Sequence, residues 1–463
     1  MNNGKIVILC PEIVPMDNKG EEAIIKGVMD ILGLKEDNCE YHIIDPSVKT
    51  LTIKSGLFLH PTRLFISSWR TKEFGIGLSI DRIYSSLCSI LRHLLDKVYP
   101  KWISIQPRTV SKLITYIKYF QNDKINKIPS SLIDSISHLA KVDYIIAGHN
   151  GGLNSDVCHV LLAFSSSLQI KYTIFGSCMK PKIKEKNNLN LYHEVFKKSE
   201  NVIARNPIGL KWAEKFFFDT NPTLAPDPAF GLIPITKQDT SLLISKLGLS
   251  DFFKKDVLLI TCAEPAPISR FSFDRQIGRI AKIKAHREFF GKVLNVLLES
   301  YDFNILFLPH TIGPTKDLDD RIIAKDIISH SNHKNSINGR CYVLEEDLNA
   351  CQLKGIISMG SIMIAERVHS VIGAIGVHTP FLCFASNKDN RVSGMIKEMA
   401  NLGDNIFYLN TPNIESCIDS FDKIYKNRIF EQQKLIKISN SFQKELDIIG
   451  NRIKLQILNS INN

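Results

Sequence analysis

The pattern of hydrophobic and polar positions predicts a strand, a loop and a helix in the first part of the chain. Residues 6–9 form a short apolar run that is typical of a buried strand, and a polar loop follows at residues 17–22. Apolar residues then recur at helical spacing from Ala23 to Ile31. Glu21 and Glu22 come just before them, where carboxylates suit the positive N-terminal end of a helix.

A regular alternation of short apolar runs with helix-length segments begins at residue 142. The runs of the first block lie at residues 142–147, 172–175, 201–204 and 223–225, and those of the second at 257–261, 305–308, 341–344, 362–365 and 381–385. This alternation predicts two parallel sheets covered by helices, joined between Pro228 and Asp256. Loops that leave the carboxyl ends of parallel strands line the ligand crevice, so we look for chemistry there.

Composition and charge exclude several classes of protein. With 463 residues, 44% hydrophobic and 23% charged, the chain is neither fibrous nor disordered. Its net charge of +11 suits phosphates, nucleic acid or an anionic membrane, but no nucleic-acid-binding signature accompanies it. The ten cysteines stand singly, without a C-x-x-C pair or other metal-site spacing, so we expect reduced thiols and no metal. No apolar run approaches the roughly 20 residues of a membrane helix, and we expect a cytoplasmic protein.

The strongest candidate site is the segment Glu366-Arg367-Val368-His369, directly after the apolar run 362–365. A guanidinium and the backbone amides of a following helix converge at such a strand end and form an anion site, where the histidine can move a proton. The alternative is that Arg367 pairs with Glu366 on the surface and that His369 is a satisfied core residue. Lys388 follows the next run and would reach the same rim, unless it is a solvated loop lysine.

A second group of candidates follows the strands of the first block. Gly151 and Gly152 belong to a glycine-rich turn that either lets the backbone approach a phosphate or carboxylate or is a plain tight turn. Arg205 ends the run 201–204, where it is either a ligand or an ordinary surface arginine. Asp227 lies between two prolines and is either structural or directed into the cleft.

These candidates together describe a cleft that receives residues from both blocks. Arg205, Arg367, His369 and Lys388 would suit a small ligand with two or three negative charges, because arginine recognises carboxylate and phosphate in a bidentate manner. Asp17 and Glu21, on the first loop, are candidate bases for a neutral acceptor.

Five sequence elements resemble those of the polysaccharide pyruvyl transferases. They are Asn18-Lys19-Gly20-Glu21-Glu22-Ala23, the turn Gly148 to Gly152, the segment IARNPIGLKWAEKF around Arg205, Pro226-Asp227-Pro228-Ala229-Phe230, and the segment ERVHSVIGAIGVHTPFLCFASNKDNRVSGMIKEM. The resemblance covers most of the chain except residues 50–140 and the C-terminal tail. It implies an α/β fold of two Rossmann-like domains, similar to the GT-B glycosyltransferase fold, with the cleft between them.

The implied domain organisation has three parts. Residues 1–235 form the N-terminal Rossmann-like domain on the acceptor side, with a basic insertion at about 50–140, and residues 236–428 form the C-terminal domain on the donor side. Residues 429–463 read as a helix that packs back on the N-terminal domain. Between Lys101 and Ser130 there are six Lys or Arg against one Asp. One hypothesis is that this segment contacts an anionic membrane from its inner face, and the alternative is a solvated insertion.

The implied activity is transfer of pyruvate from phosphoenolpyruvate, as co-substrate and without a cofactor, to a sugar of a cell-surface glycan or its lipid-linked precursor. By this resemblance Arg205, Arg367 and His369 hold the donor, His369 is the general acid, and Asn18 contributes to substrate binding. The expected product is a ketal. Glu21 stands where the family more often has Asp. The competing hypothesis is a nucleotide-sugar glycosyltransferase or epimerase on the same fold.

Overall fold

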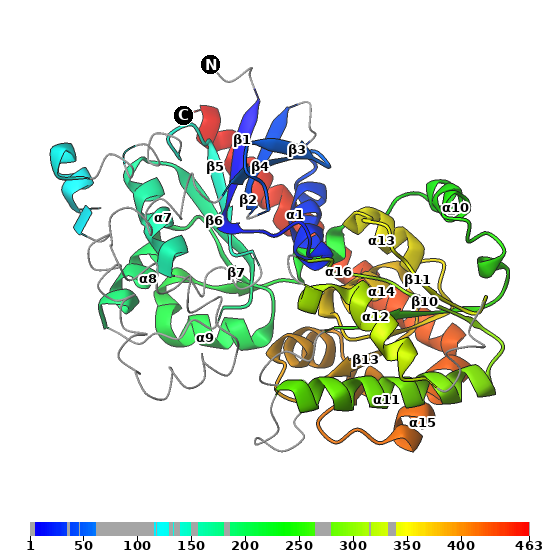
Figure 1. Cartoon of the computed structure of the whole chain (residues 1–463). Helices are drawn as coiled ribbons and strands as arrows, with labels where there is room; N and C mark the ends of the chain where they lie inside the picture. The colour runs from blue at the N-terminus through cyan, green and yellow to red at the C-terminus, as the bar shows by residue number, and fades with distance from the viewer. Residues whose placement is uncertain are drawn as a thin grey trace.

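The computed structural model consists of two α/β domains, each built on one sheet (Figure 1). It describes residues 5–34, 38–45, 47–61, 115–116, 118–128, 133, 139–149, 156–179, 186–263, 279–313, 316–331 and 339–462. The predicted insertion at about 50–140 and the glycines Gly151 and Gly152 lie largely or wholly outside these residues. None of the described helices is both long and apolar enough to cross a membrane.

The sheet of the N-terminal domain has the strand order β3-β4-β2-β1-β5-β6-β7-β8. All neighbouring strands are parallel except β3 and β4. The strands are β1 (Ile6–Ile13), β2 (Cys39–Asp45), β3 (Thr52–Lys54), β4 (Leu57–Pro61), β5 (Tyr144–Ala147), β6 (Lys171–Ser177), β7 (Val202–Ala204) and β8 (Thr223–Leu224). The apolar pattern did not predict β2, β3 and β4, because polar side chains interrupt β2 and β3 is exposed along its whole length.

The sheet of the C-terminal domain is entirely parallel, with the order β11-β10-β9-β12-β13-β14. Its strands are β9 (Val257–Thr261), β10 (Asn304–Phe307), β11 (Cys341–Val343), β12 (Ile362–Ala365), β13 (Phe381–Ala385) and β14 (Ile406–Tyr408). Every residue of the central strands β9 and β12 is buried. Full burial explains why these strands are continuous apolar runs in the sequence and why the pattern located them correctly.

Helices cover both faces of each sheet. In the N-terminal domain they are α1 (Lys19–Leu32), α7 (Asp156–Ser167), α8 (Lys186–Lys198) and α9 (Pro207–Phe217). In the C-terminal domain they are α10 (Lys237–Lys246), α11 (Arg279–Ser300), α12 (Asp320–Ser329), α13 (Ala350–Ile357), α14 (Val368–Val377), the π-helix η9 (Val392–Met399) and α15 (Ile414–Lys426). Alternate residues of β9 serve the two faces: Leu258 packs in the core that includes α11, and Leu259 in the core that includes α14.

The second of these cores continues across the boundary between the domains. It joins Ile24 of α1 to Val371 of α14 and to Leu446 of the last helix, α16 (Arg428–Asn462). Figure 1 shows α16 passing from the C-terminal domain to the N-terminal domain, where Gln456 accepts a hydrogen bond from Asn201 at 2.6 Å. The shared apolar core holds the two domains together and brings the carboxyl ends of the two sheets toward each other.

A buried lysine also connects the domains. Lys354 of α13 donates hydrogen bonds to the carbonyl oxygens of Phe230 and Leu232, at 3.1 and 2.5 Å, in the segment that leaves the N-terminal domain. Burial lowers the pKa of this ammonium group to about 8, because two carbonyl dipoles replace the lost water only in part. The linker between the domains is therefore held at a fixed point.

Candidate active site between the two sheets

His369 lies where the two domains meet. It belongs to the first turn of α14, and its imidazole packs against the first turn of α1, where a Cβ added to Gly20 would be 2.4 Å from Nδ1. The side chain is 8% exposed, and its buried Nε2 has no hydrogen-bond partner among the described residues. Asp227 Oδ2 lies 4.0 Å from Nε2. A buried imidazole nitrogen without a partner is costly, and such exceptions call for a functional explanation.

The surroundings of His369 favour its neutral form. Burial lowers its pKa well below the ordinary value, and the positive charges of Arg205 and Arg391 and the nearby His149 and His310 lower it further. An anion that entered this field would reverse part of the effect, since a nearby negative charge favours the charged imidazolium. The protonation state of His369 therefore depends on what occupies the site.

Arg205 is fully buried, so the expectation of an ordinary surface arginine is wrong. Its Nη1 donates to Asp227 Oδ2 at 2.5 Å, and its Nε and Nη2 donate to Cys178 Sγ at 3.1 and 3.0 Å. The next residue, Asn206, caps α9 and also donates to Cys178 Sγ, at 3.3 Å. Buried ion pairs of this kind fix a guanidinium in one orientation.

Asp227 is fully buried, and both of its carboxylate oxygens have partners. Its Oδ1 accepts a hydrogen bond from the backbone N–H of Ala229 at 2.9 Å and caps the 3-10 helix η6 (Pro228–Gly231). Its Oδ2 pairs with Arg205 and faces His369. The flanking prolines therefore hold a carboxylate that is structural at one oxygen and lies beside the candidate acid at the other.

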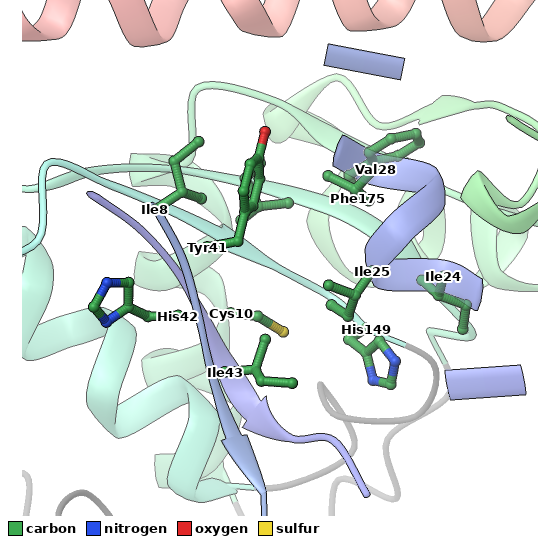
Figure 2. Close-up of a pocket in the computed structure, with 11 residues that line it drawn as sticks. Ile8, Cys10, Ile24, Ile25, Val28, Tyr41, His42, Ile43, His149 and Phe175 are labelled. Carbon is green, nitrogen blue, oxygen red and sulfur yellow. The ribbon is translucent and has the colours of Figure 1, made fainter. Parts of the chain in front are cut away.

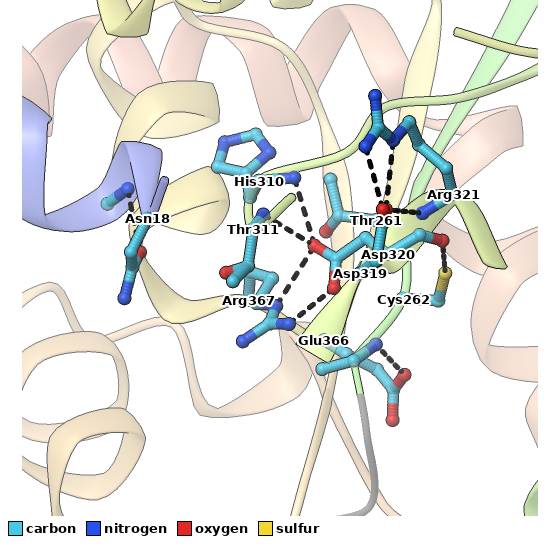
Figure 3. Close-up of polar contacts among 12 residues, drawn as sticks. Asn18, Thr261, Cys262, His310, Thr311, Asp319, Asp320, Arg321, Glu366 and Arg367 are labelled. Carbon is cyan, nitrogen blue, oxygen red and sulfur yellow. Dashed lines mark hydrogen bonds and ion pairs between the residues drawn. The ribbon is translucent and has the colours of Figure 1, made fainter. Parts of the chain in front are cut away.

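Arg367 does not pair with Glu366, so that alternative is wrong. Its Nε and Nη2 donate to the two carboxylate oxygens of Asp320, the first residue of α12 (Figure 3). Glu366 is turned to the other side of β12, where it accepts hydrogen bonds from the backbone N–H of Ala263 at 2.8 Å and contacts His286 Nε2 at 3.0 Å. Two adjacent residues are thus fixed by partners from different helices.

The loop before α1 crosses to the C-terminal domain. Asn18 caps α1 through Gly20 N at 3.1 Å and forms a β-bridge with Thr311. The carbonyl oxygen of Asp17 accepts from Ile312 N at 3.0 Å, and Lys19 N donates to the carbonyl oxygen of His310 at 2.8 Å. Asn18 and Asp17 therefore lie at the contact between the domains.

The other candidates differ in their surroundings. The Glu21 carboxylate lies 3.2 Å from His149 Nδ1, so the carboxylate proposed as a base is engaged with a buried histidine. Lys388 is exposed on the loop after β13, and its backbone N–H donates to Ser386 Oγ at 3.1 Å. Arg391, farther along the same loop, pairs with Asp389 at 2.8 Å. This loop leads into η9, which reaches Asn206 at Gly394.

Sequence reasoning missed several residues of the site: Asp320, His310, His149, Arg391 and Cys178. His310 and His149 each follow a predicted strand, so their positions at strand ends were a usable signal. Asp320 had no such signal, because it begins a helix and acts on an arginine of another segment. Among the described residues, no group of three or more His, Cys, Asp or Glu is arranged to hold a metal ion.

Two cavities lie near these residues. One, between the domains, is lined by Lys19, His310, Lys354 and His369 together with apolar residues of α1, α13 and α14. The other lies under α1 (Figure 2) and is lined mainly by apolar side chains such as Ile24, Val28 and Ile43, with His149 at one end. Only the cavity between the domains is lined by His369, so we assign the candidate site to it and its rim.

The fold is similar to that of two proteins solved with UDP or UDP-GlcNAc. S. aureus MnaA, solved with UDP, is 13% identical with a TM-score of 0.52, over 99% of this chain and 98% of that one. A UDP-GlcNAc 2-epimerase from Neisseria meningitidis, solved with UDP-GlcNAc, is 12% identical with a TM-score of 0.48, over 99% and 100% of the two chains. The predicted fold class, two α/β domains similar to the GT-B fold, is confirmed.

Searches by sequence identify the family. No curated protein matches the chain. A family model described as polysaccharide pyruvyl transferase matches residues 18–388, from the cap of α1 to the loop after β13. The match includes His369, Arg367 and Arg205, the residues that the structure gathers where the sheets meet. The chain belongs to the polysaccharide pyruvyl transferase family.

Proposed function

We propose that this protein transfers the pyruvyl group of phosphoenolpyruvate to sugar hydroxyls of a cell-surface glycan or its lipid-linked precursor and forms a ketal. The observation that carries the proposal is His369, whose buried Nε2 lacks a hydrogen-bond partner among the described residues and lies beside the Arg205–Asp227 pair. Family membership supports the reaction class. The arrangement provides a proton carrier within a group of cations.

The charges around His369 support an anionic donor. Arg205 and Arg391, one from each domain, act on His369, and Arg367 acts on the neighbouring His310. Each of the three arginines is held by one carboxylate. Phosphoenolpyruvate carries a phosphate and a carboxylate on the same carbon, and a group of fixed positive charges favours an anion of this kind. Arg205 contributes through its charge, because its nitrogens already donate to Asp227 and Cys178. Fixed cations also stabilise charge that develops in a transition state, because they need no reorganisation when the reaction occurs.

The proposed chemistry uses His369 as a switchable acid. The anionic donor raises the pKa of the imidazole, which takes up a proton and transfers it to the methylene carbon of the donor. The central carbon becomes electrophilic, and a sugar hydroxyl adds to it and releases its proton. The bond to the phosphate oxygen then breaks, phosphate leaves, and a second hydroxyl adds with loss of its proton to close the ketal. Protonation that requires bound donor avoids a charged, unpaired imidazole in the empty protein.

Ligand-induced stabilisation tests the donor directly. A ligand that binds only the folded protein raises the melting temperature, so phosphoenolpyruvate should do so, with inorganic phosphate and a UDP-sugar as comparisons. The Arg367→Ala variant should lose this shift, while His369→Ala should keep more of the binding than of the turnover. A shift with the UDP-sugar and none with phosphoenolpyruvate would contradict the proposal and favour a sugar-nucleotide enzyme.

A further inference from the structure

Asp320 is a buried carboxylate at which two parts of the site meet. It is 1% exposed, and its Oδ2 accepts hydrogen bonds from the backbone N–H groups of His310 and Thr311, both at 2.9 Å. The same Oδ2 accepts from Arg367 Nε at 3.2 Å, and Oδ1 accepts from Arg367 Nη2 (Figure 3). One side chain therefore receives four hydrogen bonds from two separate segments.

The pairing determines which edge of Arg367 remains available. Asp320 occupies Nε and Nη2, and no described residue is shown to accept a hydrogen bond from Nη1. The guanidinium is 18% exposed, so it is held firmly at one edge and still reaches the surface of the site. A guanidinium fixed in this way loses less conformational freedom when it binds an anion.

The hydrogen bonds from the backbone of His310 and Thr311 to the Asp320 carboxylate act indirectly on the N-terminal domain. The segment 310–313 that it holds is the one that pairs with residues 17–19 through the bridge between Asn18 and Thr311. Lys19 N donates to His310 O and Ile312 N donates to Asp17 O in the same contact. The acceptor-side loop therefore rests on a segment whose shape depends on Asp320.

We propose that Asp320 is a positioning residue that orients Arg367 toward the donor anion and sets the segment 310–313 against the loop 17–19 of the N-terminal domain. One carboxylate then orders the donor side and the acceptor side of the site together. The part that concerns Arg367 rests on the proposed function, and the part that concerns the two loops does not. Asp320 acts through other residues in both cases.

The neighbouring residue offers a matched control. Asp319 caps α12, and among the described residues its carboxylate pairs with Arg321, at 2.7 Å, and not with Arg367. Asp320→Asn and Asp319→Asn each remove one negative charge at the same helix end and keep the side-chain size. A general effect of charge on α12 would appear in both variants. A loss that depends on the contacts of Asp320 with Arg367 and with residues 310–311 would appear in Asp320→Asn alone.

The first measurement is the affinity for phosphoenolpyruvate by calorimetry. We expect Asp320→Asn to weaken binding at least about tenfold, as loss of an orienting partner does elsewhere, and Asp319→Asn to leave it unchanged. In an Arg367→Lys background, which lacks the bidentate edge, Asp320→Asn should change the affinity much less. Equal effects in both backgrounds would show that Asp320 does not act through Arg367 and would overturn this part of the proposal.

The second measurement is hydrogen exchange of the full-length protein without ligand. In Asp320→Asn, the amides of His310 and Thr311 and the loop 17–19 should exchange faster, while the strand β12 exchanges as in the wild type. Unchanged exchange in both loops, or an equal increase in Asp319→Asn or in β12, would refute the link between the loops. If the wild type fails to bind phosphoenolpyruvate, the proposed function is wrong, and the exchange data still decide whether Asp320 orders the loops.

Discussion

Gly20 provides a direct test of the position of His369. Gly20 lies in the first turn of α1, and a Cβ built on it would be 2.4 Å from His369 Nδ1 and 2.8 Å from Cγ. Atoms in contact rest at roughly 3.5 Å, so Gly20→Ala requires the helix and the imidazole to separate by about 1 Å. The substitution adds one methyl group and no charge, and its effect on the site is therefore steric.

The expected loss of activity follows from this displacement. A shift of about 1 Å in a reacting group can cost roughly 100-fold in rate. The free energy of unfolding should change little. An overpacking penalty of about 1–3 kcal/mol is offset by up to about 1 kcal/mol from the better helix propensity of alanine. We therefore expect a variant that folds, binds the donor more weakly and turns over at about a hundredth of the wild-type rate.

The assay is phosphate release from phosphoenolpyruvate with a glycan acceptor, together with urea unfolding of each variant. Gly33→Ala is the control at the other end of the same helix, because Gly33 has a φ of +56° and its Cβ would meet Lys454 Nζ at 3.8 Å. Gly33→Ala should lose stability through its backbone conformation, without a specific loss of turnover per folded molecule. Wild-type turnover in a stable Gly20→Ala variant would refute the placement of His369 in the mechanism.

Three further predictions concern buried charges. Arg205→Met leaves the charge of Asp227 buried and unpaired, so it should lower the free energy of unfolding by about 3–5 kcal/mol. The double variant Arg205→Met/Asp227→Asn should lose less. Equal losses for the two variants in urea unfolding would argue against a coupled pair. The pKa of Lys354 falls from 10.5 to about 8 on folding, so between these pH values the unfolded chain binds more protons than the folded protein. The free energy of unfolding of the wild type, relative to that of Lys354→Met, should therefore rise with pH across this window. A difference between the two proteins that does not change with pH would contradict this sign. Because the pKa of His369 is lowered, its NMR signals in the protein without donor should not titrate between about pH 8 and 6, and a midpoint near 6.5 would contradict the burial argument.

Sequence pattern predicts most of the C-terminal sheet because its strands are buried on both faces. The predicted bounds of β9, β12 and β13 coincide with the observed ones. In the N-terminal domain the pattern failed at β2, β3 and β4, where polar or exposed positions interrupt the apolar signal. Periodicity records which side chains meet the core, so it detects central strands better than edge strands.

The sequence by itself determined that Arg205, Arg367 and His369 follow buried strands, and strand direction in a parallel sheet then places each at the carboxyl edge of its own sheet. Only the tertiary structure decided how they are paired. Arg367 binds Asp320, 47 residues away, and not the adjacent Glu366, which turns toward His286, 80 residues away. Periodicity describes the local path of the chain, whereas these pairs depend on the register in which distant helices pack on the sheet. That His369 Nε2 has no hydrogen-bond partner in the described part of the chain also follows from that packing, because the surroundings of this side chain exist only once the two domains meet.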